Sequence, residues 1–180
     1  MIPLKPLSAD AIPAALTKAE RYRLLNEPHQ AESICEDILA ADPGNAQAVA
    51  ILLLALTDQF AKGDGHVVAR ALELVKRMES AYDRAYFAGL VAERRARALM
   101  NGGAGRARTA GPWLRDAMEH YEQAEALRSQ GNDEARLRWN ACARVLNAHP
   151  EMAVQDDERT APLISRHAPS PISIMPKVVV

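Results

Sequence analysis

The sequence is short of several features, and each shortage excludes a class of protein. A basic excess is missing, because 22 Lys and Arg residues stand against 23 Asp and Glu residues in a chain of 180. That balance is not typical of a dedicated nucleic-acid binder. The most apolar run, residues 49–56, is too short to cross a bilayer, for which about 20 residues are needed. The first residues, from Met1 to Leu7, lack the basic and apolar regions of a signal peptide. We therefore expect a cytoplasmic protein without membrane insertion.

Cysteine and aromatic residues are also scarce. The two cysteines, Cys35 and Cys142, have no C-x-x-C spacing, so we expect small buried hydrophobic side chains rather than a redox or metal pair. Aromatic residues make up 4% of the chain, whereas alanine is abundant. Because alanine has the best helix propensity and lets backbones approach closely, this composition favours packed helices.

Apolar residues recur at the three- and four-residue spacing of amphipathic helices, as at Ala31, Ile34, Cys35 and Ile38. Turns rich in proline and glycine separate these segments, and no segment shows the alternation of a strand. The pattern predicts an all-α protein with helices at residues 12–25, 30–41, 46–61, 66–78, 82–101, 112–129 and 132–148. Residues 1–11 would be an N-terminal extension.

The last part of the chain, residues 149–180, differs in composition from the rest. It is polar at first and then contains Pro162, Pro169, Pro171 and Pro176 without helical periodicity. Such a segment buries too little apolar surface to order by itself, so we expect a proline-rich tail. Its apolar end, residues 171–180, either stays disordered or becomes ordered in a groove of this chain or of a partner.

Small and large residues alternate in a repeated way along the helices. The positions are Ala19 and Tyr22; Ala31, Cys35 and Ile38; Asp42, Pro43, Gly44 and Asn45; Val49, Leu52, Leu53 and Leu56; Ala85, Ala88, Gly89 and Ala92; Ala117, Tyr121 and Ala124; Trp139, Cys142, Ala143 and Leu146. This pattern resembles the tetratricopeptide repeat (TPR) family, in particular small three-repeat proteins of the bacterial type. The resemblance implies a right-handed superhelix of three hairpins, at residues 12–45, 46–81 and 82–131, closed by a capping helix at 132–148. The main rival is an ordinary helix bundle.

The resemblance also implies a function and a binding surface. TPR proteins hold a segment of another protein in a concave groove lined by the first helix of each repeat. Carried over to this chain, the groove residues are Leu16, Glu20, Arg23, Gln47, Ala50, Leu54, Asp58, Tyr86, Leu90, Glu93, Arg94, Asn140 and Arg144. We therefore expect an adaptor or scaffold subunit. An assembly or secretion chaperone for an apolar client is the alternative.

One charge feature stands apart from the repeats. Six arginines with no acidic residue between the first and the last form an expected basic lip: Arg94, Arg95, Arg97, Arg106, Arg108 and Arg115. The lip would contact an acidic partner segment, a phosphorylated group or a nucleic-acid backbone. Alternatively, the first arginines complement a helix C-terminus and the others are solvated. The nucleic-acid hypothesis is the weakest, because the overall charge of the chain is near neutral.

The sequence shows no convincing catalytic motif. Gly102, Gly103 and Gly105 lack the Lys and Ser or Thr of a phosphate loop. Asp116 and His120 are four residues apart and could share a metal on one helix face, but no third ligand is apparent. A solvated pair is the favoured interpretation. We expect no enzyme activity, no metal and no cofactor.

Overall fold

The computed structural model describes residues 2–62, 65–103 and 108–152, and this part of the chain is all-helical. Within these residues there are seven α-helices and no strand. Their bounds are α1 (Ile12–Leu24), α2 (Pro28–Ala41), α3 (Ala46–Thr57), α4 (Gly65–Lys76), α5 (Ala81–Met100), α7 (Ala110–Leu127) and α8 (Glu134–Ala148). Three short 3-10 helices are η1 (Ala9–Ala11), η2 (Phe60–Lys62) and η3 (Pro150–Met152). The prediction of an all-α protein is confirmed for these residues.

The helices begin and end where the local sequence favours it. Pro28 is the first residue of α2, two residues earlier than expected, because proline is well tolerated at the first helical position. The Asn45 side chain caps α3 by accepting a hydrogen bond from the Ala48 N–H at 2.9 Å. Ser80 caps α5 in the same way through the Asp83 N–H at 3.2 Å. The predicted helix at 46–61 is shorter, since α3 ends at Thr57 and η2 follows.

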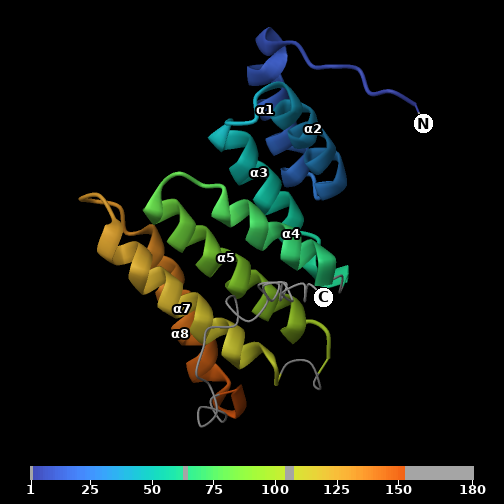
Figure 1. The fold of residues 1–180 in the computed structure, drawn as a ribbon. Helices are drawn as coiled ribbons and strands as arrows, with labels where there is room; N and C mark the ends of the chain where they lie inside the picture. The colour runs from blue at the N-terminus through green and yellow to red at the C-terminus, as the bar shows by residue number, and fades with distance from the viewer. Residues whose placement is uncertain (1, 63–64, 104–107, 153–180) are drawn as a thin grey trace, which may run out of the picture.

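The helices follow one another as a row of hairpins (Figure 1), with most contacts between helices that are consecutive in the chain. The pair α1 and α2 lies at one end of the row, and the pair α7 and α8 lies at the other. Helix α3 also contacts both α1 and α5, so these three helices form one layer. Since α5 and α7 form the most extensive pair, the row is joined most tightly in its C-terminal half.

Two hydrophobic clusters lie along this row, and α5 contributes to both. The N-terminal cluster is built from α1 to α4, η2 and the Ala88 and Val91 side of α5. The C-terminal cluster is built from α7, α8, η3 and the Ala92 and Ala96 side of α5. Helix α3 is buried on most of its circumference, as its continuous apolar sequence predicts.

The folded part of the chain extends beyond residue 148. Met152 in η3 is 4% exposed, and its carbonyl oxygen accepts a hydrogen bond from Arg115 Nη1 at 3.2 Å. A Cβ atom on Gly111 would lie 2.3 Å from the same carbonyl oxygen, so η3 packs directly on the start of α7. The first residues of the expected tail, in η3, thus contact α7. The rest of the predicted tail lies outside the described residues.

None of the described helices combines the length and the apolar composition that a bilayer span requires.

Candidate partner-binding face

Two hollows lie between α3 and α5, one near each end of the two helices. The first, called the apolar hollow below, has a volume of about 370 Å³ and is lined by Pro43, Gly44, Ala46, Val49, Ala50, Arg77, Met78, Glu79, Ser80, Asp83 and Phe87. The second, called the arginine pocket, has a volume of about 250 Å³ and is lined by Thr57, Asp58, Phe60, Ala61, Glu93, Arg94, Arg97, Ala98, Asn101 and Arg138. Together they define the α3–α5 face.

The spacing along α3 places the two hollows on one side of that helix. Ala46, Ala50, Leu54 and Asp58 are each four residues apart, so they lie on one helix face. Ala46 and Ala50 line the apolar hollow and Asp58 lines the arginine pocket. Half-buried Leu54 therefore lies between the two hollows. The face runs from an apolar end to a charged end.

Asp58 joins three helices at the charged end of the face. Arg23 Nε of α1 donates to Asp58 Oδ2 at 2.9 Å, and Arg94 Nη1 of α5 donates to Asp58 Oδ1. The three side chains are 22–23% exposed. Each guanidinium thus holds one oxygen of the same carboxylate, and of these two arginines Arg94 lines the pocket.

Glu93 forms the second charged centre, and it is only 1% exposed. The Tyr121 hydroxyl of α7 donates to Glu93 Oε2 at 2.7 Å. Arg97 Nη2 lies 2.6 Å from Glu93 Oε1, and Arg138 Nη1 of α8 lies 3.5 Å from the same oxygen. Burial, and then the Glu93 charge, raise the pKa of Tyr121 far above its ordinary value. The phenol therefore remains a hydrogen-bond donor to the carboxylate.

The charges of the two centres do not cancel. Four guanidinium groups, from Arg23, Arg94, Arg97 and Arg138, share two carboxylates, which leaves two positive charges in excess. Each guanidinium has five N–H donors, and the interactions above use one donor of each. Arg97 is 54% exposed, so part of its guanidinium group reaches solvent at the pocket. Arg138 is 35% exposed and also forms a hydrogen bond with the Tyr86 side chain.

Several of the predicted groove residues are brought together here. Arg23, Asp58, Glu93 and Arg94 form the two charged centres just described. Ala50 and Leu54 are half-buried on the α3–α5 face. The remaining members of the predicted groove that reach solvent line neither hollow: Glu20 on α1 and Gln47 on α3 are exposed, Tyr86 on α5 and Asn140 on α8 are half-buried, and Arg144 on α8 is exposed.

Two apolar residues of the predicted groove are buried. Leu90 is 2% exposed and Leu16 is 8% exposed, so neither side chain is available to a partner. Leu16 belongs to the N-terminal hydrophobic cluster. Both were assigned to the groove from repeat spacing, which gives the side of a helix but not the depth at which a neighbouring helix covers it.

The described arginines of the expected basic lip differ in burial and in contacts. Arg94 and Arg97 line the arginine pocket. Arg95 is half-buried on α5, and Arg108 is exposed before α7. Arg115 is half-buried against η3, and Arg106 lies outside the described residues. The pocket instead gains Arg138, which sequence reasoning missed. Its position one turn before buried Cys142 on α8 was the available signal.

The expectation of a solvated Asp116 and His120 pair is also wrong. Asp116 is 1% exposed, and both ring nitrogens of His120 are buried as well. Within residues 2–62, 65–103 and 108–152, no group of three or more His, Cys, Asp or Glu side chains is placed to hold a metal ion.

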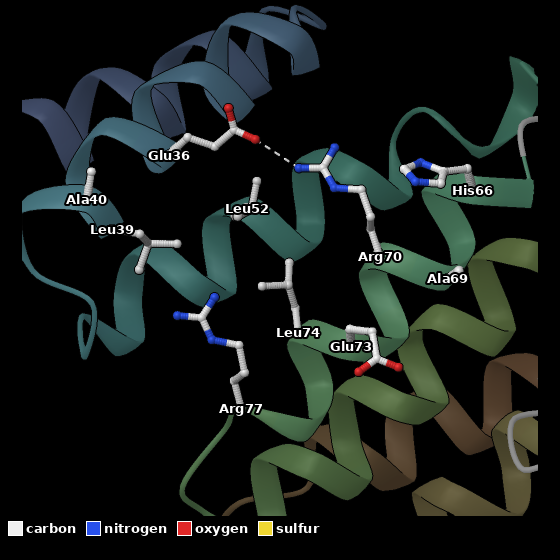
Figure 2. A pocket seen from close by; sticks show the side chains of 10 residues that line it. All are labelled: Glu36, Leu39, Ala40, Leu52, His66, Ala69, Arg70, Glu73, Leu74 and Arg77. Atoms are coloured by element: carbon white, nitrogen blue, oxygen red, sulfur yellow. Dashed lines mark hydrogen bonds and ion pairs between the residues drawn. The ribbon is translucent and has the colours of Figure 1, made fainter. Parts of the chain in front are cut away.

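A third hollow lies on the other side of α3, between α2 and α4 (Figure 2), with a volume of about 620 Å³. Leu39, Leu52 and Leu74 point into it from α2, α3 and α4. An ion pair between Arg70 and Glu36, at 2.9 Å, crosses one end. Its rim carries acidic and basic side chains together, so its charge selects no class of ligand.

Comparison with known proteins gives no match to a family model, to a curated protein or to a solved structure.

Proposed function

We propose that this chain is a protein–protein interaction module, an adaptor or scaffold subunit of the cytoplasm, that holds a segment of a partner against the α3–α5 face. The observation that carries the proposal is the alignment of the apolar hollow, Leu54 and the arginine pocket along one side of α3. A TPR-like superhelix is the architecture that we propose for the described helices, since α1, α3 and α5 form one layer.

The dimensions of the face fit a short peptide. From Ala46 to Asp58 the helix rises about 18 Å, which an extended segment of about five or six residues would cover. Apolar side chains of such a segment would bury surface against Val49, Met78 and Phe87, which line the apolar hollow. Burial supplies the free energy of binding, and the charged end fixes the direction of the segment.

A chaperone that protects an apolar client would use the same hollow. The two functions differ in what happens after binding, since a chaperone releases its client and a scaffold remains in a stoichiometric complex. We do not propose a nucleic-acid function, because two arginines of the expected lip line the pocket, where they pair with acids, and Arg115 donates to η3.

Affinity capture from a native lysate, with three forms of the protein, tests the proposal. Leu54→Glu places a charge between the two hollows. Leu127→Glu is the matched control, because Leu127 is 53% exposed at the end of α7 and lines neither hollow. We expect the wild type and Leu127→Glu to retain the same partner and Leu54→Glu to lose it. Retention of that partner by all three forms would contradict the proposal.

A further inference from the structure

The charged end of the α3–α5 face points to a specific kind of partner. We propose that the arginine pocket binds the carboxylates of an acidic segment in the partner protein, an inference that rests on the proposed function and adds the chemistry of what is held. Three features of the pocket carry it: its excess charge, the fixed positions of its arginines and its size.

The excess charge is local and reaches solvent. Two carboxylates share four guanidinium groups in one place, although the whole chain has a net charge of −1. One of these carboxylates, Glu93, is inside the protein at 1% exposure, whereas Arg97 on its outer side is 54% exposed. Arg94, Arg97 and Arg138 line the pocket together with Asp58 and Glu93, so the lining has one positive charge in excess. Arg23, which pairs with Asp58 from outside the lining, adds a second.

The arginines are held in place before any ligand arrives. Arg94 is fixed by Asp58, and Arg97 and Arg138 are fixed by the buried Glu93. The Tyr121 hydroxyl holds the other oxygen of Glu93 at 2.7 Å, so this carboxylate cannot turn outward to fill the pocket. Ordering a long side chain on binding costs free energy. Side chains that are already ordered form charge-assisted hydrogen bonds without that cost.

The pocket is a cleft for side chains rather than for a folded surface. Its volume of about 250 Å³ is of the order of two acidic side chains, and it opens on the same side of α3 as the apolar hollow. The preferred segment then has acidic residues at one end and apolar residues about four to five positions away, the spacing set by a separation of roughly 15 Å.

The test uses fluorescein-labelled hexaglutamate, with binding to the full chain followed by anisotropy at low and at physiological salt. Arg97→Gln and Arg138→Gln remove donors from the pocket. The matched controls are Arg21→Gln on α1 and Arg136→Gln on α8, because neither residue lines the pocket. We expect the two pocket variants to weaken binding about tenfold and the controls to change it less than about twofold.

Arg97 is the more informative position if Arg138→Gln lowers the stability of the fold. Arg97→Lys keeps the positive charge but loses the planar guanidinium group. We therefore expect its affinity for hexaglutamate to lie between those of the wild type and Arg97→Gln. Inorganic phosphate and a phosphoserine peptide are the competing probes. Hexaglutamate binding that is absent at about 1 mM, equal in all variants, or displaced by phosphate but not by unlabelled glutamate peptide would overturn the inference.

Two combinations of results distinguish failure of this inference from failure of the proposed function. If Leu54→Glu abolishes capture of the partner while the arginine variants retain it and hexaglutamate does not bind, the face holds a partner that is not acidic. If hexaglutamate binds in the pocket but capture is indifferent to Leu54→Glu, the pocket is an anion site and the partner-holding function fails.

Discussion

The N-terminal and C-terminal halves of the row of helices differ in the kinds of residue that they bury. The N-terminal cluster is filled by branched side chains such as Leu53, Leu56 and Ile38, and its buried polar residues, Thr57 and Gln59, are uncharged. The C-terminal cluster relies on alanines and on large aromatic side chains. Its buried polar residues, Glu93 and Asp116, are acidic. The C-terminal half therefore buries charged groups, which depend on ionic partners, whereas the described residues that are fully buried in the N-terminal half are apolar or uncharged.

This difference explains where the candidate site lies. A buried carboxylate needs cationic partners, and the partners of Glu93 extend from the interior to the surface. The network that stabilises the C-terminal half therefore also builds the wall of the arginine pocket. In the N-terminal half, where the described buried polar groups are neutral, the same face of α3 offers an apolar hollow instead.

The reactivity of the two cysteines should show the largest effect, because each reports on one half. Burial raises the pKa of Cys35 and of Cys142 to about 12 from an ordinary 9.0, which leaves about a thousandfold less thiolate at neutral pH. In single-cysteine variants we expect labelling with iodoacetamide to be at least about a hundredfold slower in the folded chain than in denaturant. Fast labelling of only one thiol would show that its half opens independently.

Replacing Glu93 should destabilise the C-terminal half selectively. Glu93→Gln removes the charge shared by Arg97 and Arg138 and weakens the acceptor of the Tyr121 hydroxyl, so we expect the free energy of unfolding to fall by about 2–3 kcal/mol. Urea unfolding measures it. In the same variant, labelling of Cys142 should speed up more than labelling of Cys35.

The control for this variant is Glu73→Gln, since Glu73 forms an exposed ion pair with Lys76 that contributes less than about 0.5 kcal/mol. If the two variants lose equal stability, the buried charges of the C-terminal half have no special role.

A substitution at Gly89 would test how closely α5 and α7 approach each other. A Cβ atom there would lie 2.8 and 2.9 Å from two ring carbons of Tyr121 and 3.1 Å from the Ala117 carbonyl oxygen. We expect Gly89→Ala to lower the free energy of unfolding by about 1–2 kcal/mol despite its better helix propensity. Gly65→Ala is the control, because no heavy atom lies within 4 Å of its added Cβ. A Gly89→Ala variant as stable as Gly65→Ala would mean that the two helices have room to separate.

The smallest expected effect is an acid sensitivity of the N-terminal half. Burial alone would raise the pKa of Glu32, but hydrogen bonds from Gln59 and Arg70 and the Arg70 charge lower it below the ordinary 4.5. Because the folded pKa is depressed, the contribution of Glu32 is complete above pH 4.5 and is lost as the pH falls through the lower folded value. We expect Glu32→Gln to flatten the pH dependence of stability in this acid range by less than about 1 kcal/mol. Melting temperatures from pH 6 down to pH 3 measure it, and an unchanged slope would contradict it.

Local features of the chain made the helices predictable. The apolar spacing and the turn from Asp42 to Asn45 indicated the ends of α2 and α3 to within a few residues. The spacing along α3 also placed Ala50, Leu54 and Asp58 on one side. These inferences succeed because helix periodicity and capping depend on residues that are close in sequence.

Long-range contacts account for what the sequence did not predict. Arg138 reaches Glu93 across 45 positions of sequence, and no spacing rule links two helices that are separated by a third. Leu90 and Asp116 are buried because neighbouring helices cover them, which periodicity on their own helices does not reveal. These contacts form only when α5, α7 and α8 pack against one another.

Photo-crosslinking inside the cell tests the central claim, that the α3–α5 face holds a partner, most directly. A p-benzoylphenylalanine residue in place of half-buried Ala50 lies in the apolar hollow, and the same residue in place of exposed Leu127 lies outside both hollows. The account predicts a discrete crosslinked protein from position 50 that is absent from position 127. Crosslinking that is equal at the two positions, or found at position 127 alone, would contradict it.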